Sequence, residues 1–171
     1  MASRRIEGDW SGGCQCGAVR YRLTARLDNA HICHCRMCQK QVGGPFAALV
    51  ASSRGDYAWT RGLPARFRSS AHVDRGFCRD CGTPLFYDET TSGHINFTIG
   101  SLDDPAQFPP RGQVGGESKL PWFDTLSDVP DRGDTGAYTE DAGWAEAIAA
   151  SNNQHPDRDT ADWMPVHERR A

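Results

Sequence analysis

The stretch Phe77-Cys78-Arg79-Asp80-Cys81-Gly82 sets two thiols three positions apart and follows them with a glycine. A Cys-x-x-Cys turn points both sulfur atoms at one centre, its inner backbone N–H groups can donate to them, and the glycine permits a positive φ. The segment Cys14-Gln15-Cys16-Gly17 repeats the arrangement with one residue between the thiols. A third segment, Cys33-His34-Cys35-Arg36-Met37-Cys38, contributes three more. The seven cysteines of the chain therefore fall into groups of two, three and two.

This grouping favours metal binding over disulfide bonds. The number of cysteines is odd, and no apolar signal segment follows the first charged residues, so we expect a cytoplasmic protein whose thiols stay reduced. Two cysteine pairs make a closed, tetrahedral four-sulfur site. The simplest assignment is that the first and last pairs in the sequence, the outer pairs, bind a structural Zn²⁺. These ligands are Cys14, Cys16, Cys78 and Cys81.

The remaining group leaves a second Zn²⁺ one ligand short. Cys33, Cys35 and Cys38 supply three thiolates, and an open coordination position is typical of a catalytic zinc. Three alternatives stay open at this point. His31 or His34 can supply a fourth ligand, iron can replace zinc in a four-cysteine site, and a Cys-x-x-Cys pair can act in redox chemistry.

Short runs separated by Gly, Pro and Asp predict a β-rich domain, in keeping with 18 Gly and 10 Pro in 171 residues. In the first run, Val19, Tyr21 and Leu23 share one face, and the second is apolar throughout, which is typical of a strand buried on both sides. The expected strands are Ala18–Thr24, Phe46–Ala51, Asp56–Thr60, Ala65–Ser69 and His94–Ile99. One turn of helix is expected over Cys35–Gln41, ended by Gly43-Gly44.

Composition divides the chain into a domain over residues 10–130 and an acidic extension over residues 131–171, with residues 1–12 as a polar lead-in. Residues 129–171 hold 4 Lys and Arg against 9 Asp and Glu, which argues against nucleic acid as a partner. No apolar run approaches the roughly 18 residues that a membrane helix needs. Trp144 and Ile148 predict a short helix within Asp141–Ala150, and the residues from His155 onward are expected to be extended and solvated.

Taken together, the cysteine motifs resemble those of the glutathione-dependent formaldehyde-activating family, also called the centromere-protein-V-like family. The resemblance covers roughly residues 10–130. It rests on Gly12–Tyr21, Cys33–Lys40 and Phe77–Tyr87, and on the later landmarks Ile99–Pro105 and Lys119–Phe123.

The resemblance implies a mainly β, Mss4-like fold of several small antiparallel sheets around zinc, followed here by the short C-terminal helix and tail. It also implies the metal partition described above, with a structural zinc on the outer pairs and a labile, catalytic zinc on Cys33, Cys35 and Cys38. The reaction assigned to the best-known members joins formaldehyde to the thiol of glutathione and gives S-hydroxymethylglutathione. The family is classed with the carbon–sulfur lyases.

Glutathione carries two carboxylates and one ammonium, so its site needs cationic or N–H-rich partners. Arg36 and Lys40 follow the second motif, Gly43 and Gly44 offer unobstructed backbone N–H groups, and Trp122 with Phe123 can wall a pocket. Solvated charges and ordinary core packing are the alternatives for these residues. For the whole chain, the alternatives to an enzyme are a zinc-stabilised protein-binding module and a zinc buffer.

Overall fold

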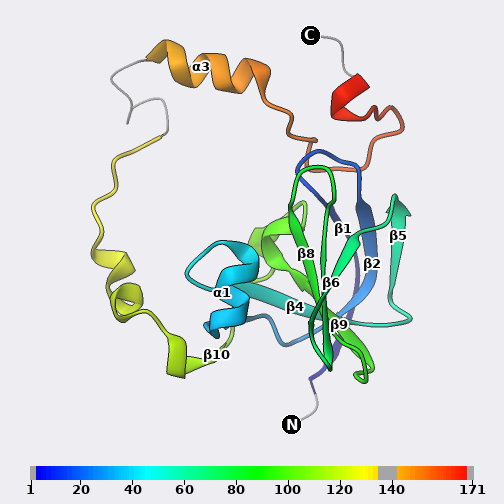
Figure 1. The fold of residues 1–171 in the computed structure, drawn as a ribbon, viewed down its shortest axis with the longest axis vertical. Helices are drawn as coiled ribbons and strands as arrows, with labels where there is room; N and C mark the ends of the chain where they lie inside the picture. Colours follow the sequence, from blue (N-terminus) through cyan, green and yellow to red (C-terminus); the bar gives the residue numbers. More distant parts are fainter. Residues whose placement is uncertain (1–2, 135–141, 169–171) are drawn as a thin grey trace.

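The computed structural model describes residues 3–134 and 142–168, which form two β-sheets, two α-helices and several short 3₁₀ turns (Figure 1). The strands are β1 (Arg5–Gly13), β2 (Arg20–Leu27), β3 (His31–Cys33), β4 (Ala47–Ser53), β5 (Tyr57–Arg61), β6 (Ala65–Ser70), β7 (Val73–Phe77), β8 (Pro84–Glu89), β9 (His94–Thr98) and β10 (Gln113–Val114). The helices are α1 (Arg36–Val42) and α3 (Ala142–Ser151), with 3₁₀ segments η1 (Ile99–Ser101), η2 (Pro105–Gln107), η3 (Gly116–Ser118), η4 (Pro121–Asp128) and η5 (Val166–Glu168). The expected mainly β class with a short C-terminal helix is confirmed.

The two sheets differ in size. The smaller has the order β1-β2-β5, and the larger has the order β10-β3-β4-β9-β8-β7-β6. Every strand pair is antiparallel except β10 with β3, which is parallel. None of the helices in the described residues is both long enough and apolar enough to cross a membrane.

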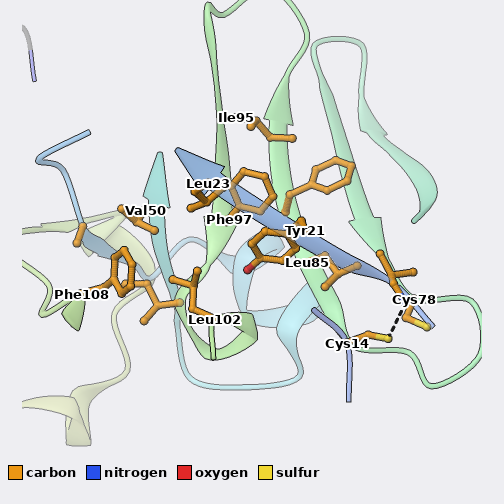
Figure 2. Close-up of a cluster of buried hydrophobic side chains, with 14 of the residues drawn as sticks. Cys14, Tyr21, Leu23, Val50, Cys78, Leu85, Ile95, Phe97, Leu102 and Phe108 are labelled. Atoms are coloured by element: carbon orange, nitrogen blue, oxygen red, sulfur yellow. Dashed lines mark hydrogen bonds between the residues drawn. The ribbon is translucent and has the colours of Figure 1, made fainter. Parts of the chain in front are cut away.

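The hydrophobic core lies between the sheets (Figure 2). Tyr21 and Leu23 of β2 are fully buried, and the Tyr21 ring stacks on Phe97 of β9 with centroids 4.5 Å apart. The predicted inward face of β2 is therefore confirmed. Successive side chains along a strand point to opposite faces of a sheet. On β4 and β9 of the large sheet, the residues before and after each core residue therefore point away from the core. On β4 the core receives Val50, and Leu49 points away from it.

The expectation of a polar lead-in over residues 1–12 is wrong. Strand β1 occupies most of that stretch and pairs along β2 from Arg5 opposite Leu27 to Gly13 opposite Arg20. It is an edge strand, and edge strands carry charged side chains without loss of their backbone pairing, so it shows little apolar periodicity. Strands β7 and β8 were also not expected.

Most of the described residues from His155 onward are exposed, as expected, but the stretch is also anchored to the domain. His155 retains only 5% of its exposure and its backbone N–H donates to the Gln15 carbonyl at 2.6 Å. The Trp163 indole donates to the Cys16 carbonyl at 2.8 Å, and Arg61 contacts both the Thr160 carbonyl and the Trp163 ring. This stretch, residues 155–163, is called the C-terminal clasp below. It is polar in sequence because most of its residues are exposed and its contacts with the domain are mainly hydrogen bonds.

A buried cation joins the clasp to the domain. The Arg20 guanidinium binds the Asp103 carboxylate with two bonds of 2.7 and 2.5 Å, and its Nε donates to Asp159 at 3.0 Å. The Arg20 side chain is 3% exposed. Burial opposes ionisation of Asp103, but hydrogen bonds from Arg20 and Ser11 hold the pKa of that carboxyl below its usual value.

Replacing Arg20 by Met is expected to lower the free energy of unfolding by about 3 kcal/mol at pH 7, because it leaves the Asp103 carboxylate largely buried and unpaired. A carboxyl whose pKa is lowered in the folded state contributes stability above its unfolded pKa and loses it as pH falls through the folded value. The deficit should therefore shrink below about pH 4. Urea denaturation measures both effects.

Arg22→Met is the matched control, because Arg22 lies two positions further along β2, on the same face as Arg20. Arg22 pairs with Asp9, and both side chains are more than half exposed, so the expected cost is about 0–1 kcal/mol. Equal destabilisation by the two variants would contradict the role given to Arg20.

Candidate metal centres and their pocket

The first cysteine group joins the two sheets. Cys14 and Cys16 lie in the turn between β1 and β2 of the small sheet, and Cys78 and Cys81 lie in the turn between β7 and β8 of the large one. The four sulfur atoms all lie within 4.8 Å of one another. Figure 2 shows Cys14 and Cys78 together at one end of the core, beside Leu85.

The spacing of these sulfur atoms fits a tetrahedral metal ion. The Sγ of Cys16 lies 3.6 Å from that of Cys14 and 3.8 Å from that of Cys78. Ligands at a Zn–S distance of about 2.3 Å sit about 3.8 Å apart at the corners of a tetrahedron, whereas a disulfide needs about 2.05 Å. The Val19 N–H donates to the Cys14 sulfur at 3.2 Å, as a metal thiolate requires.

The two turns have the expected backbone. Gly17 has φ +80° and donates its N–H to the Cys14 carbonyl at 3.0 Å, and Gly82 has φ +77° and donates to the Cys78 carbonyl at 2.9 Å. Each glycine therefore closes its turn in the left-handed region, which disfavours other residues. In the second turn, the Thr83 hydroxyl lies 3.1 Å from the Cys81 sulfur. Burial alone would raise the pKa of Cys81, but hydrogen bonds, chiefly from Thr83, lower it to about 7.

The second group gathers Cys33, Cys35 and Cys38, again within 4.8 Å of one another. Cys33 ends β3, Cys35 precedes α1, and Cys38 lies in the first turn of α1. Among the described residues, this group contains three ligand atoms and no fourth. It suits a metal ion with one coordination position directed away from the protein.

A buried arginine faces this group. Both terminal nitrogens of Arg75 lie 3.6 Å from the Cys38 sulfur, and its Nε donates to the Ser69 hydroxyl at 3.0 Å. Burial raises the pKa of Cys38 to about 12, with Arg75 acting in the opposite direction. Burial also opposes ionisation of Cys35, but the backbone N–H of Cys38 and the charge of Arg75 hold the pKa of Cys35 below its usual value. Arg75 would thus offset part of the negative charge if a bound metal ion held the three cysteines as thiolates.

The three-cysteine group opens into a pocket of about 220 Å³. The pocket lies on the face of the large sheet opposite the core, where Tyr87 pairs with Arg75 on one side and with Asn96 on the other. Besides the cysteines, its lining is Met37, Leu49, Val73, Tyr87 and Val114, with the polar residues His31, Ser69, Arg75 and Asn96. We call it the thiol pocket.

Neither histidine lies within the three-cysteine group. His31 lines the thiol pocket and its Nδ1 bonds to the Asn29 carbonyl at 2.8 Å, but neither its ring nor that of His34 joins the cysteine group. His34 is buried, with its Nε2 2.9 Å from Gln113 and its ring edge against Phe123.

The five residues predicted to contact the substrate do not lie together in the structure. Arg36 and Lys40 line a neighbouring groove of about 370 Å³, which we call the cationic groove and which shares Met37, Ser69 and Arg75 with the thiol pocket. The other three lie outside the thiol pocket. Gly43 ends α1 with φ +65°, Gly44 donates its N–H to Gln39, and Trp122 is 48% exposed on η4. The role of all five in substrate binding stays a prediction.

Sequence reasoning missed the groups contributed by the large sheet. Arg75, Tyr87 and Asn96 come from three adjacent strands, and only the register of β7, β8 and β9 brings them together. A weak signal exists for Asn96, which interrupts the apolar run of β9, since Asn is depleted in strands.

The C-terminal clasp lies over the turn of Cys14 and Cys16, so it should slow the release of metal from the four-cysteine group. Trp163→Ala removes the bond to the Cys16 carbonyl, so a chelator should strip metal from the four-cysteine group roughly 5- to 10-fold faster, as expected for one lost hydrogen bond. Release into a colorimetric chelator measures the rate. Trp144→Ala on α3 is the control and should leave it unchanged; equal rates in wild type and Trp163→Ala would refute the protective role of the clasp.

Comparisons with known proteins agree with this geometry. A crystal structure of a Rhodobacter sphaeroides protein superimposes with a TM-score of 0.51 at 20% identity, over 61% of this chain and 99% of that one, and so supports the fold. A Schizosaccharomyces pombe protein described as an uncharacterized lyase is 26% identical over 89 residues, 52% of this chain and 64% of its own length.

A Halomonas elongata protein named "Putative glutathione-dependent formaldehyde-activating enzyme" is 28% identical over 131 residues, 71% of this chain and 83% of its own length. The model of the family described as glutathione-dependent formaldehyde-activating enzyme matches residues 9–115, which include all seven cysteines. By this match, the chain belongs to the glutathione-dependent formaldehyde-activating enzyme family.

Proposed function

We propose that this protein is a zinc-dependent enzyme that forms or cleaves the carbon–sulfur bond of an aldehyde–thiol adduct. Its model reaction is the formation of S-hydroxymethylglutathione from formaldehyde and glutathione. The observation that carries the proposal is that the group of Cys33, Cys35 and Cys38 has only three sulfur atoms and faces a pocket. A four-cysteine group would leave no coordination position for a substrate. The names of the relatives, a lyase and a formaldehyde-activating enzyme, support the same reaction class.

In this proposal, Cys33, Cys35 and Cys38 hold the reactive zinc, and the outer pairs hold a structural one. A zinc ion bound by the three cysteines would lower the pKa of a substrate thiol from about 8.5 and supply its thiolate at neutral pH. We favour this role over polarisation of the aldehyde, because three thiolates make the metal a weak Lewis acid.

The side chains of the thiol pocket then prepare the addition. Arg75 neutralises part of the charge that another thiolate brings to the group. Leu49, Val73 and Val114 give the pocket apolar walls that limit water, which competes for the aldehyde as a nucleophile. The addition forms a carbon–sulfur bond as the carbonyl π pair moves to oxygen. The proton lost by the thiol is returned to that oxygen through solvent.

The cationic groove supports an anionic thiol such as glutathione as the partner. The thiol pocket, at about 220 Å³, accommodates the reacting end of a ligand, and Arg36 and Lys40 next to it suit carboxylates. We also propose a cytoplasmic location, where thiols remain reduced and free cysteines can serve as metal ligands.

Cys35→Ser is expected to abolish turnover and leave the fold intact, because Cys35 is half-buried at the pocket and takes no part in the group that joins the sheets. Elemental analysis should find one zinc lost and one retained, and near-ultraviolet circular dichroism should be unchanged. Turnover is followed with a panel of aldehydes and thiols. Full activity in this variant would refute the zinc-based mechanism.

The wild-type protein distinguishes the alternatives in the same experiment. Loss or perturbation of one zinc on addition of glutathione, with turnover, supports the enzyme. Two inert zinc ions without turnover of any aldehyde–thiol pair would instead indicate a protein-binding module, and labile zinc without turnover would indicate a zinc buffer.

A further inference from the structure

Asn96 is a largely buried residue of β9 whose side chain borders the thiol pocket. It lies in the middle of β9, between the core residues Ile95 and Phe97, but its own side chain is on the opposite face of the sheet and lines the thiol pocket. Its cross-strand neighbours are Tyr87 on β8 and Ala51 on β4. Only 9% of the residue is exposed.

No hydrogen bond joins the Asn96 side chain to another group in the part of the chain that the structure describes. The fully buried side-chain polar atoms without a partner belong to other residues, so the Asn96 amide is accessible from the thiol pocket that it lines. Asn29 differs in this respect, because its Oδ1 accepts the backbone N–H of Ala51 on β4 at 3.0 Å. The Asn96 amide instead borders the space in front of Cys33, Cys35 and Cys38.

A strand position of this kind gives the amide a fixed direction. Both neighbours of Asn96 along β9 are fully buried, and Asn96 pairs across to two further strands, so the backbone cannot turn the side chain elsewhere. Neutral amides are suited to carbonyl recognition, because their N–H donates to oxygen without adding charge. A fixed donor in a water-poor pocket stabilises charge that develops on that oxygen.

We propose that Asn96 binds the oxygen of the aldehyde and donates an N–H to it as the carbon–sulfur bond forms. The inference rests on the proposed function, since it places the reacting carbonyl between the three-cysteine group and β9. As sulfur attacks the carbonyl carbon, the π pair moves to the oxygen that Asn96 holds. The oxygen then takes a proton from solvent, equal to the one the thiol released, and the hemithioacetal leaves. In the reverse direction the same donor holds the oxygen as the carbon–sulfur bond breaks.

The test compares Asn96→Leu and Asn96→Asp with the wild-type holoenzyme. Leu keeps the branched shape and removes both polar atoms, and Asp keeps the shape and an acceptor but has no N–H. Both variants are expected to lose about 10- to 100-fold in kcat and to retain two zinc ions and the wild-type circular dichroism. Asn153→Leu on the exposed C-terminal segment is the matched control and should retain wild-type kcat.

A second readout does not depend on turnover. N-methylformamide, an unreactive carbonyl compound, is bound to the zinc-loaded protein, and the infrared stretch of its carbonyl is recorded. A donor lowers this frequency, so the band of the bound compound should lie lower in the wild type than in Asn96→Leu; this difference is the shift due to Asn96. If the wild type shifts the band through Asn96 but turns over no aldehyde–thiol pair, the binding role stands and the proposed function fails. Bands at the same frequency in the bound wild type and the bound Asn96→Leu protein, or wild-type kcat in Asn96→Leu, would overturn the inference.

Discussion

The four-cysteine group is the constraint on which the rest of the structure depends, because it ties the turn of one sheet to the turn of the other. The hydrophobic core alone is modest, with 38% hydrophobic residues in the chain. Sulfur atoms 3.6 to 3.8 Å apart, each from a buried turn, can be held together without disulfides only by a shared ion or by protonated thiols. A metal ion bound there contributes directly to folding free energy.

Fixing the second turn also fixes the thiol pocket. The turn of Cys78 and Cys81 connects β7 to β8, so its geometry sets the register that places Arg75 opposite Tyr87. Tyr87 in turn lies opposite Asn96 on β9. The same large sheet therefore carries the core on one face and the pocket on the other, and the three-cysteine group lies over its β3 end.

Sequence reasoning reached the parts of the protein that local spacing encodes. The grouping of the cysteines, the turn glycines Gly17 and Gly82, the helix after Cys35 and the strands with clear alternation follow from short-range patterns. Strand β1 and the C-terminal clasp were missed because their contacts are backbone pairing and hydrogen bonds, which need no apolar pattern. Arg75 and Asn96 were missed for a different reason. Their proximity depends on strand register, which the sequence of a single chain does not reveal.

The central claim is that two metal ions are bound in unlike ways, one closed by four sulfur ligands and one held by three. Zinc K-edge X-ray absorption on the doubly loaded protein measures this most directly, because it counts sulfur ligands per zinc. The account predicts an average between three and four sulfurs with a light-atom ligand, rising towards four when glutathione is added. Four sulfurs per zinc before any thiol is added, with no change afterwards, would contradict it.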